Sequence, residues 1–393
     1  MAAASTEHLA AHREFPNFDY IRLFAASLVL FSHSFFIADN TDANEPLVRL
    51  IGEGQILGIY GVCIFFIISG FLVTMSARTR GTVAAFAASR ILRVYPGLFV
   101  CQLVTATALG LIFTNSTVSH FLGSLIPLRY AVHYTIDPAM SWEVPTVTFY
   151  LDPKGTGVGL NGSLWTIQQE LFCYFILAVL MLTRMLRWPV ALAIVLATLP
   201  FFTPWNKDDV DPIMDFIHWS IDDNRVTDFF WVAPSFFMGS LIYFFWERKG
   251  ELPAWPLVLC VADFAWAAHR HHYYDHFALY AAYPLLRLAT ASRYRLPSLK
   301  KFGDISYGIY LYGWPCQQAV RGLLGPGITW LTVFALAGIS ASLCAYASWH
   351  IVERPALRLK RFFKPKLAAS LPASVLREPE PDEESTRNAT PAT

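Results

Sequence analysis

Two ionisable side chains, Arg22 and His33, lie eleven residues apart in the first apolar segment of the chain. At 100° per residue, this spacing brings both side chains to within about 20° of each other on one helix face, about 16 Å apart along the axis. A neutral imidazole can take a proton from a hydroxyl, and a guanidinium can bind a phosphate through two hydrogen bonds. The structural alternative is a buried histidine bonded to a neighbouring helix, with Arg22 reaching to the membrane interface.

A second basic pair, Arg90 and Arg93, lies in segment 86–96 (Phe-Ala-Ala-Ser-Arg-Ile-Leu-Arg-Val-Tyr-Pro). Residues three apart share one face if the segment is helical. Two guanidinium groups on one face suit a nucleotide diphosphate or an anionic lipid headgroup. The competing interpretation is the ordinary enrichment of arginine in inner loops. Pro96 is expected to mark the entry to the next span.

A carboxylate, Glu170, follows seven residues after Ser163 in the segment Ser-Leu-Trp-Thr-Ile-Gln-Gln-Glu. If Ser163 caps a helix, Glu170 lies about 10 Å inside an apolar span. A carboxylate at that depth needs a cation or its own proton. It can orient a histidine, pair with an arginine or bind an acceptor hydroxyl, and a structural tie between helices explains it equally well.

Two late segments complete the candidates. Tyr307 and Tyr310 are three residues apart and can share a polar face, although such tyrosines more often form an interfacial belt. Segment 353–355, Glu-Arg-Pro, is expected to end the last helix at the inner membrane interface.

The composition shows which elements must position these residues. Hydrophobic residues make up 55% of the 393 and charged residues 15%, against roughly 45–50% and about 25% in soluble domains. Apolar runs of about 18–22 residues, long enough to cross a bilayer as helices, alternate with short charged stretches. The sequence therefore predicts an all-α membrane protein with about ten transmembrane helices. The predicted spans are 19–38, 56–76, 97–114, 164–183, 188–204, 227–246, 254–269, 275–291, 303–323 and 328–350.

The distribution of lysine and arginine predicts the orientation. Eighteen lie in the loops and the start of the tail on one side and seven on the other, which places both termini in the cytoplasm. Loops 115–162 and 205–226 then face outward. The chain divides into a cytoplasmic N-terminus (1–18), one transmembrane domain (19–360) and a tail (361–393) expected to be disordered.

Other classes of protein are disfavoured. A net charge of +1 gives no basis for nucleic-acid binding. The six cysteines lie in or beside apolar runs without metal-site spacing, so we expect packing residues, with neither a metal site nor a disulfide framework. The first 17 residues lack an apolar segment with a cleavage site, so the first apolar run is expected to remain as a helix.

Taken in order, these segments resemble the acyltransferase 3 family of membrane enzymes, which O-acylate extracytoplasmic glycans and some small glycosylated metabolites. The resemblance covers roughly residues 17–360. The matching segments are Arg22-x10-His33, 61–72 (G-V-x-x-F-F-x-x-S-G-F-L), 86–96 (F-x-x-R-R-x-x-R-x-Y-P), 163–170 (S-L-W-x-x-x-x-E), 306–315 (S-Y-x-x-Y-L-x-H-x-P) and 353–355 (E-x-P). Ser89 and Gly313 depart from this pattern, because the family often has an arginine and a histidine there.

The resemblance implies a multi-pass enzyme of the inner or plasma membrane. Its donor would be cytoplasmic acyl-CoA, with acetyl-CoA as the expected form and no tightly bound cofactor. Its acceptor would be a hydroxyl of a sugar or glycan. The implied catalytic residues are His33, as general base or as a covalent acyl carrier, and Glu170. The implied donor-binding residues are Arg22, Arg90 and Arg93, and the candidate substrate-binding residues are Asp19, Trp165, Tyr307 and Tyr310.

Two other functions compete with this prediction. A glycan or lipid transporter or flippase would also need charge and aromatic residues in the membrane, but it predicts repeats and broken helices that the sequence does not display. In a structural membrane subunit, nothing would offset the free-energy cost of placing the ionisable side chains of Arg22, His33 and Glu170 in the membrane.

Overall fold

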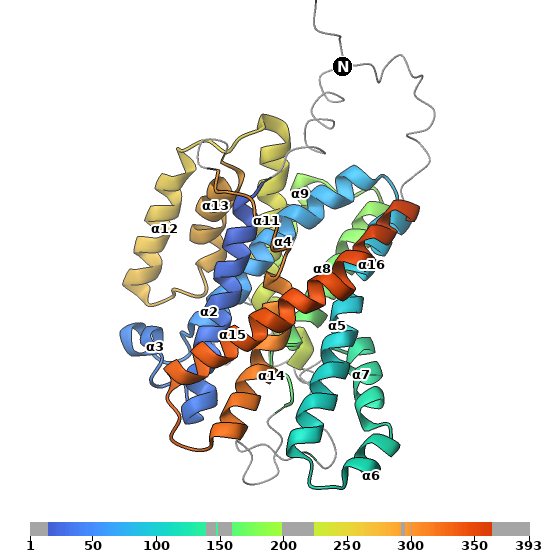
Figure 1. Ribbon diagram of the computed structural model, residues 1–393. Helices are drawn as coiled ribbons and strands as arrows, with labels where there is room; N and C mark the ends of the chain where they lie inside the picture. The colour runs from blue at the N-terminus through green and yellow to red at the C-terminus, as the bar shows by residue number, and fades with distance from the viewer. Residues whose placement is uncertain are drawn as a thin grey trace, which may run out of the picture.

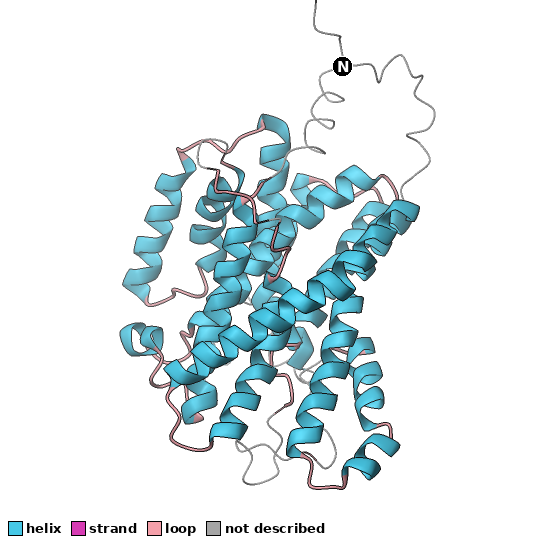
Figure 2. Ribbon diagram, viewed as in Figure 1, coloured by secondary structure: helices cyan, strands magenta, loops and turns pink. Residues whose placement is uncertain are grey.

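The computed structural model describes residues 15–138, 147, 159–198, 224–291, 295–299 and 301–363. Within these ranges the regular structure is helical, apart from one isolated β-bridge between Thr114 and Val147 (Figure 2). The α-helices are α2 (Asn17–Asp39), α3 (Pro46–Ile51), α4 (Leu57–Arg80), α5 (Val83–Phe113), α6 (Val118–Gly123), α7 (Ile126–Ile136), α8 (Trp165–Leu182), α9 (Trp188–Thr198), α11 (Asn224–Lys249), α12 (Pro256–Arg270), α13 (Phe277–Thr290), α14 (Ser306–Leu324), α15 (Trp330–Ser348) and α16 (Arg354–Arg358).

The helices identify a multi-pass membrane protein. In the described part of the chain, six are long and apolar enough to cross a bilayer: Asn17–Asp39, Leu57–Arg80, Val83–Phe113, Trp165–Leu182, Asp228–Lys249 and Trp330–Phe363. The other four predicted spans coincide with α9, α12, α13 and α14, which are shorter or more polar. The all-helical class is confirmed, whereas the count of ten spans and the cytoplasmic termini stay predictions.

Helix α5 begins earlier than the sequence predicts. Its N-cap is Thr82, whose hydroxyl accepts a hydrogen bond from the Ala85 amide, and Pro96 lies inside the helix. The helix therefore begins before Pro96, whereas the expectation that Pro96 marks the entry to a membrane span stays a prediction. Alanine-rich residues before Pro96 favour helix strongly enough to offset the one backbone hydrogen bond that proline removes. With 31 residues, α5 is about 46 Å long, which exceeds the roughly 30 Å thickness of the hydrocarbon core.

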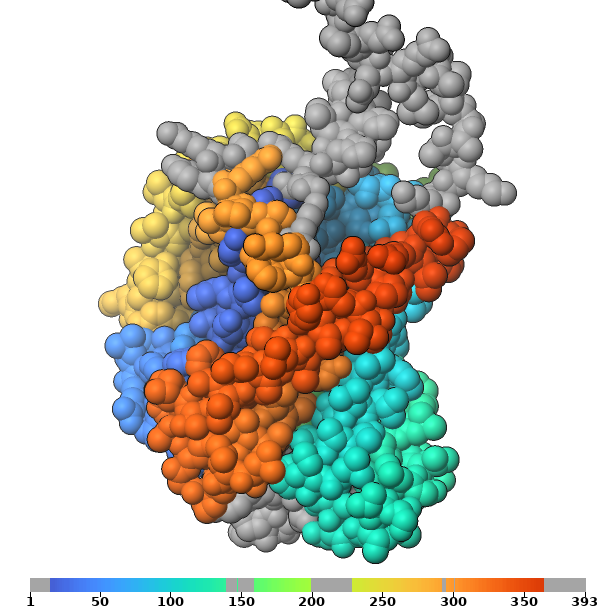
Figure 3. Space-filling model, in the orientation of Figure 1, coloured from blue at the N-terminus to red at the C-terminus, as the bar shows by residue number. Residues whose placement is uncertain are grey.

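The last long helix also continues past its predicted end. A π-helical turn, Trp349–Glu353, joins α15 to α16, and a 3₁₀ turn, Leu359–Phe363, follows. Pro355 lies in the first turn of α16, where a missing amide hydrogen costs no helical bond. The predicted stop at 353–355 is therefore wrong. This rod runs diagonally across the front of the molecule (Figures 1 and 3).

The core forms where α4 packs between α2 and α11. A Cβ on Gly70 would lie 1.8 Å from the Phe236 carbonyl oxygen, and one on Gly239 would lie 2.1 Å from the Ile67 carbonyl oxygen. Helices α4 and α11 therefore approach as closely as two backbones can, and any larger residue at either glycine would force them apart. This contact holds α4 against α11, while α4 also packs along α2, and α2 and α4 form one wall of the cavity described below.

The remaining segments surround this core. Helices α6 and α7 lie beside α5 and account for part of the long loop predicted at 115–162, while α12 and α13 form a pair on the other side of the bundle (Figure 1). All six cysteines are free, as predicted. The predicted N-terminal segment 1–14, most of loop 205–226 and tail residues 364–393 lie outside the described residues.

Candidate active site

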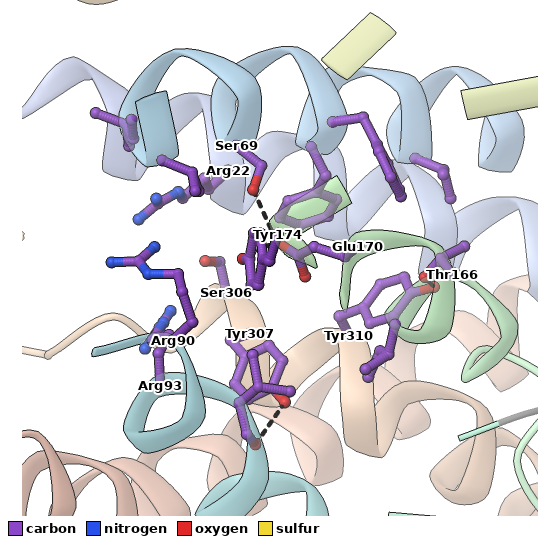
Figure 4. A pocket seen from close by; sticks show the side chains of 17 residues that line it. Arg22, Ser69, Arg90, Arg93, Thr166, Glu170, Tyr174, Ser306, Tyr307 and Tyr310 are labelled. Atoms are coloured by element: carbon purple, nitrogen blue, oxygen red, sulfur yellow. Dashed lines mark hydrogen bonds between the residues drawn. The ribbon is translucent and has the colours of Figure 1, made fainter. Parts of the chain in front are cut away.

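A cavity lies inside the bundle between α2, α4, α5, α8 and α14. Its polar lining comes from segments far apart in the sequence: Arg22, Ser69, Arg90, Arg93, Thr166, Glu170, Tyr174, Ser306, Tyr307 and Tyr310. Figure 4 shows the three arginines gathered at one end, the carboxylate of Glu170 in the middle, and Thr166 with Tyr310 at the other end. The cavity is therefore charged at one end and neutral at the other.

Asp304 organises the charged end. Its Oδ2 accepts hydrogen bonds from Arg93 Nη2 at 2.6 Å and Arg22 Nη1 at 3.1 Å, and its Oδ1 accepts one from Ser306 Oγ at 2.7 Å. Burial by itself would raise the pKa of this carboxyl in the loop before α14, but Arg93, Arg22 and Ser306 lower it to about 2. An ionised Asp304 thus ties α2 and α5 to the start of α14.

The second counter-ion at this end is Glu353. Arg93 Nη1 lies 3.4 Å from Glu353 Oε2, and Ser348 Oγ donates to Glu353 Oε1 at 3.1 Å. Glu353 is 2% exposed, so this carboxylate needs its cation. The π-helical turn that replaces the predicted helix end therefore carries a buried ion-pair partner to α5.

Arg90 differs from the other two arginines. Its Nε donates to Ser89 Oγ at 3.2 Å and its Nη2 to Ser76 Oγ at 3.4 Å, and its guanidinium lies 5.7 Å from the centre of the Tyr174 ring. Within the described ranges it forms no ion pair. Ser89, which departs from the family pattern, here positions the arginine that follows it.

Glu170 is held in the middle of the cavity by two hydroxyls. Its Oε1 accepts from Ser69 Oγ at 2.7 Å and from the Tyr174 hydroxyl one helical turn later. The structure gives Glu170 no hydrogen bond to His33 among the residues it describes. Of the roles open to this carboxylate, binding a group inside the cavity fits its position better than orienting that histidine.

The neutral end of the cavity closes at Tyr310. Its hydroxyl donates to the Ser163 carbonyl oxygen and hydrogen-bonds with Thr166 Oγ1, while the Tyr307 hydroxyl donates to the Val94 carbonyl oxygen at 3.0 Å. Both tyrosines thus face inward from α14 and do not form an interfacial belt.

His33 lies outside the lining of this cavity. Its ring packs edge-on against Trp314, with centroids 4.8 Å apart, and Trp314 follows Tyr310 by one turn of α14. Arg22 and His33 both face the α14 segment, as their spacing predicts, but they are not in one cavity. The described residues provide no hydrogen bond to the imidazole.

The two remaining residues that were predicted to bind substrate lie beside the main cavity. Trp165 is partly buried against the core beside the lining residue Thr166. Asp19 lines a separate small cleft that also contains Asp304. Neither side chain lines the main cavity.

Sequence reasoning missed Asp304, Ser69 and Tyr174. Ser69 lies in segment 61–72, which was considered only for its resemblance, and Asp304 lies just before segment 306–315. Tyr174 has a usable signal, because it follows Glu170 by four residues and so lies above it on the same helix face.

A comparison against known families finds the same family that the ordered motifs indicate. The acyltransferase domain of the acyltransferase 3 family matches residues 15–350. The chain is a member of this family. It is therefore a membrane O-acyltransferase, and the resemblance inferred from its motifs is confirmed.

Two relatives cover almost the whole chain. Nodulation protein 10 of Rhizobium leguminosarum bv. viciae is 32% identical over 383 residues, which cover 91% of this chain and 96% of the relative. The O-acetyl transferase of Shigella phage Sf6 is 26% identical over 348 residues, 86% of this chain and 94% of the relative. No solved structure matches the chain significantly.

Proposed function

We propose that the protein transfers an acetyl group from cytoplasmic acetyl-CoA to a hydroxyl of a sugar or glycan on the outer side of the inner or plasma membrane. The observation that carries this proposal is the convergence of Arg22, Arg90 and Arg93 at one end of the cavity. Coenzyme A carries its phosphates at one end and its thioester at the other end of a narrow arm. A cavity that is cationic at one end and neutral at the other suits that molecule. The relative named an O-acetyl transferase supports acetyl as the group transferred.

Within the donor site, the three arginines have different roles. Arg90 has no ion pair among the described residues, so its charge is available to a phosphate. Arg93 and Arg22 are already bound to Asp304, and they hold the helices in place while contributing positive potential. Arg90 is thus the principal phosphate ligand, with Arg93 and Arg22 supporting it.

His33 acts as the general base. The acceptor oxygen attacks the thioester carbonyl carbon, His33 takes the hydroxyl proton, and the carbon–sulfur bond breaks. The proton then passes to the departing thiolate, so the products are an acyl ester and the free thiol of coenzyme A. Because His33 lies beyond Tyr310 and outside the cavity, this role requires the passage that Tyr310 closes to open between the thioester arm and the acceptor; the family motif Arg22-x10-His33 is what supports the role.

Mass spectrometry of surface glycans tests this function. Cells carrying the wild-type gene should contain acetylated glycans that are absent from cells lacking the gene and from cells expressing His33→Gln at equal level. The matched control is Arg78→Ala, which changes an exposed arginine paired with Glu247 outside the cavity. Identical glycans in all four strains would exclude glycan acetylation in those cells.

A further inference from the structure

Two more basic side chains lie next to the charged end of the cavity without lining it. Arg80, at the end of α4, donates from Nε to Ser76 Oγ at 3.0 Å, and Arg90 donates to the same oxygen at 3.4 Å. The two guanidinium groups therefore meet at one hydroxyl. Lys360 lies in the 3₁₀ turn that packs against α5, close enough to interact electrostatically with Arg80, Arg90 and Arg93.

This cluster lacks the negative charge needed to balance it. No ion pair joins Arg80, Arg90 or Lys360 to a carboxylate in the described part of the chain, and all three are partly buried. Around the charged end of the cavity, the described basic residues are Arg22, Arg80, Arg90, Arg93 and Lys360, against at most three negative charges on the described residues Asp304, Glu353 and Glu170. Like charges brought together in this way repel one another unless an anion binds between them.

Ordinary inner-loop cations behave differently in the same protein. Arg78, two residues before Arg80, is 42% exposed in its side chain and pairs with Glu247. Arg354 and Arg358, on the same rod as Lys360, are exposed to solvent. Topology alone therefore explains those residues. It does not explain why Arg80 shares a hydroxyl with Arg90, or why Lys360 is partly buried in the turn that packs against α5.

We propose that Arg80 and Lys360, together with Arg90, form a second phosphate subsite at the mouth of the cavity, which binds the ribose 3′-phosphate of the coenzyme A nucleotide. This inference rests on the proposed function. The 3′-phosphate belongs to the nucleotide, the part of the molecule farthest from the thioester, so it remains at the mouth when the arm points toward Tyr310. The diphosphate then lies deeper, beside Arg90 and Arg93.

The test compares two ligands that differ by one phosphate group. Coenzyme A and 3′-dephospho-coenzyme A are titrated by calorimetry into the purified full-length protein. The wild type should bind coenzyme A more tightly by about tenfold or more, as expected for a charge-assisted hydrogen bond. Lys360→Ala and Arg80→Ala should lose that preference by binding coenzyme A more weakly, with unchanged affinity for the dephospho form.

Matched controls and a conservative variant make the result specific. The control variants change neighbours of the two cations, Arg358 on the same rod as Lys360 and Arg78 on the same helix as Arg80. Both Arg358→Ala and Arg78→Ala should keep the wild-type preference. Lys360→Arg should retain most of it. If an alanine variant does not fold, Lys360→Gln and Arg80→Gln replace it, and the wild-type preference still tests the subsite.

Several outcomes would overturn the proposal. Equal wild-type affinity for the two ligands would refute the subsite while leaving the proposed function intact, whereas no binding of either ligand would instead refute the acyl-CoA donor. Equal weakening of both ligands in the variants would assign the cations to the diphosphate. Native mass spectrometry would reveal the last alternative. If the wild type retains bound phosphatidylglycerol and the variants lose it, while their nucleotide binding is unchanged, the cluster binds lipid headgroups.

Discussion

The two ends of the cavity satisfy their polar groups in different ways. At the charged end, Arg22 and Arg93 share the carboxylate of Asp304, and the bonds that join the helices are ionic. At the neutral end, the Tyr310 hydroxyl donates to the Ser163 carbonyl oxygen and Trp314 Nε1 donates to the Gly159 carbonyl oxygen at 3.2 Å. One end is thus built from charges and the other from neutral hydrogen bonds.

This difference corresponds to the two tasks of an acyltransferase. An anionic donor is held best by an excess of cations that are already ordered. Proton transfer from a neutral hydroxyl needs a base that is free of a neighbouring cation, and His33 beside Trp314 has such a position. Under the proposed function, donor binding and proton transfer would occupy different ends of α2 and α14, so single changes should separate them.

The largest effect is expected at the neutral end. His33→Gln keeps one hydrogen-bonding group of imidazole but removes the base, so we expect transfer to fall by about 10²–10⁴-fold. Acetyl-CoA binding, measured by calorimetry, should stay near the wild-type value because the charged end is untouched. A folded His33→Gln protein with near wild-type turnover would refute the assignment, and Glu170 would become the leading base.

At the charged end, loss of the shared counter-ion should cost stability. Asp304→Ala leaves Arg22 and Arg93 without their common partner. Because these side chains are about one fifth exposed, we expect a cost above the roughly 1 kcal/mol of an exposed pair and at most about 3–5 kcal/mol, the cost of breaking a buried pair. Denaturation in detergent measures this cost. The control is Arg78→Ala, which removes the exposed member of the Arg78–Glu247 pair and should cost about 1 kcal/mol or less. Equal losses in the two variants would mean that Asp304 is an ordinary surface partner.

Removal of Arg90 should affect binding more than stability. Arg90→Ala is expected to weaken acetyl-CoA binding by about 1–3 kcal/mol, the value of a charge-assisted hydrogen bond. Because Arg90 has no ion pair among the described residues, the unfolding free energy should change little. Calorimetry and denaturation of the same preparation check both statements. Unchanged acetyl-CoA affinity in a folded variant would mean that Arg90 only sets the orientation of the chain in the membrane.

The smallest effect is expected from Tyr310→Phe. This change removes the hydroxyl that donates to the Ser163 carbonyl oxygen and keeps the ring that closes the cavity. The same hydroxyl also hydrogen-bonds with Thr166 Oγ1, and each neutral hydrogen bond that is lost costs about 1 kcal/mol. Acetyl-CoA affinity should remain unchanged, because Tyr310 lies at the end opposite the arginines. A large loss of affinity would show that the donor's charged part does not lie where the arginines converge.

The sequence predicts the helical class and the charged residues better than their partners. Intramembrane charge is conspicuous because of its cost, so Arg22 and Glu170 stand out without a structure. Their partners are harder to find in the sequence: Asp304 lies in a short loop and Glu353 lies at a predicted helix end, although both bind Arg93. Such pairings join residues more than 200 positions apart, and no local pattern encodes them.

The sequence also predicts the helix boundaries near two prolines poorly, again because long-range contacts decide them. A proline is a reasonable marker of a helix end, yet Pro96 and Pro355 both lie within continuous helical rods. In each case ion pairs near the proline tie the rod to its neighbours, and this tertiary stabilisation outweighs the local preference. Helical periodicity correctly puts Arg22 and His33 on one face, but it cannot show that Tyr310 and Trp314 separate them.

The central claim is that the donor enters at the arginine end from the cytoplasm and its acyl group leaves on the outer side. Native membrane vesicles, prepared inverted or right side out from cells that carry the gene, are supplied with radiolabelled acetyl-CoA. Label should enter glycan in inverted vesicles with the wild-type and Arg78→Ala proteins, and not with His33→Gln. Intact right-side-out vesicles should remain unlabelled. Labelling that occurs only from the outer face would contradict the orientation of the donor site, and labelling that persists with His33→Gln would contradict the chemistry.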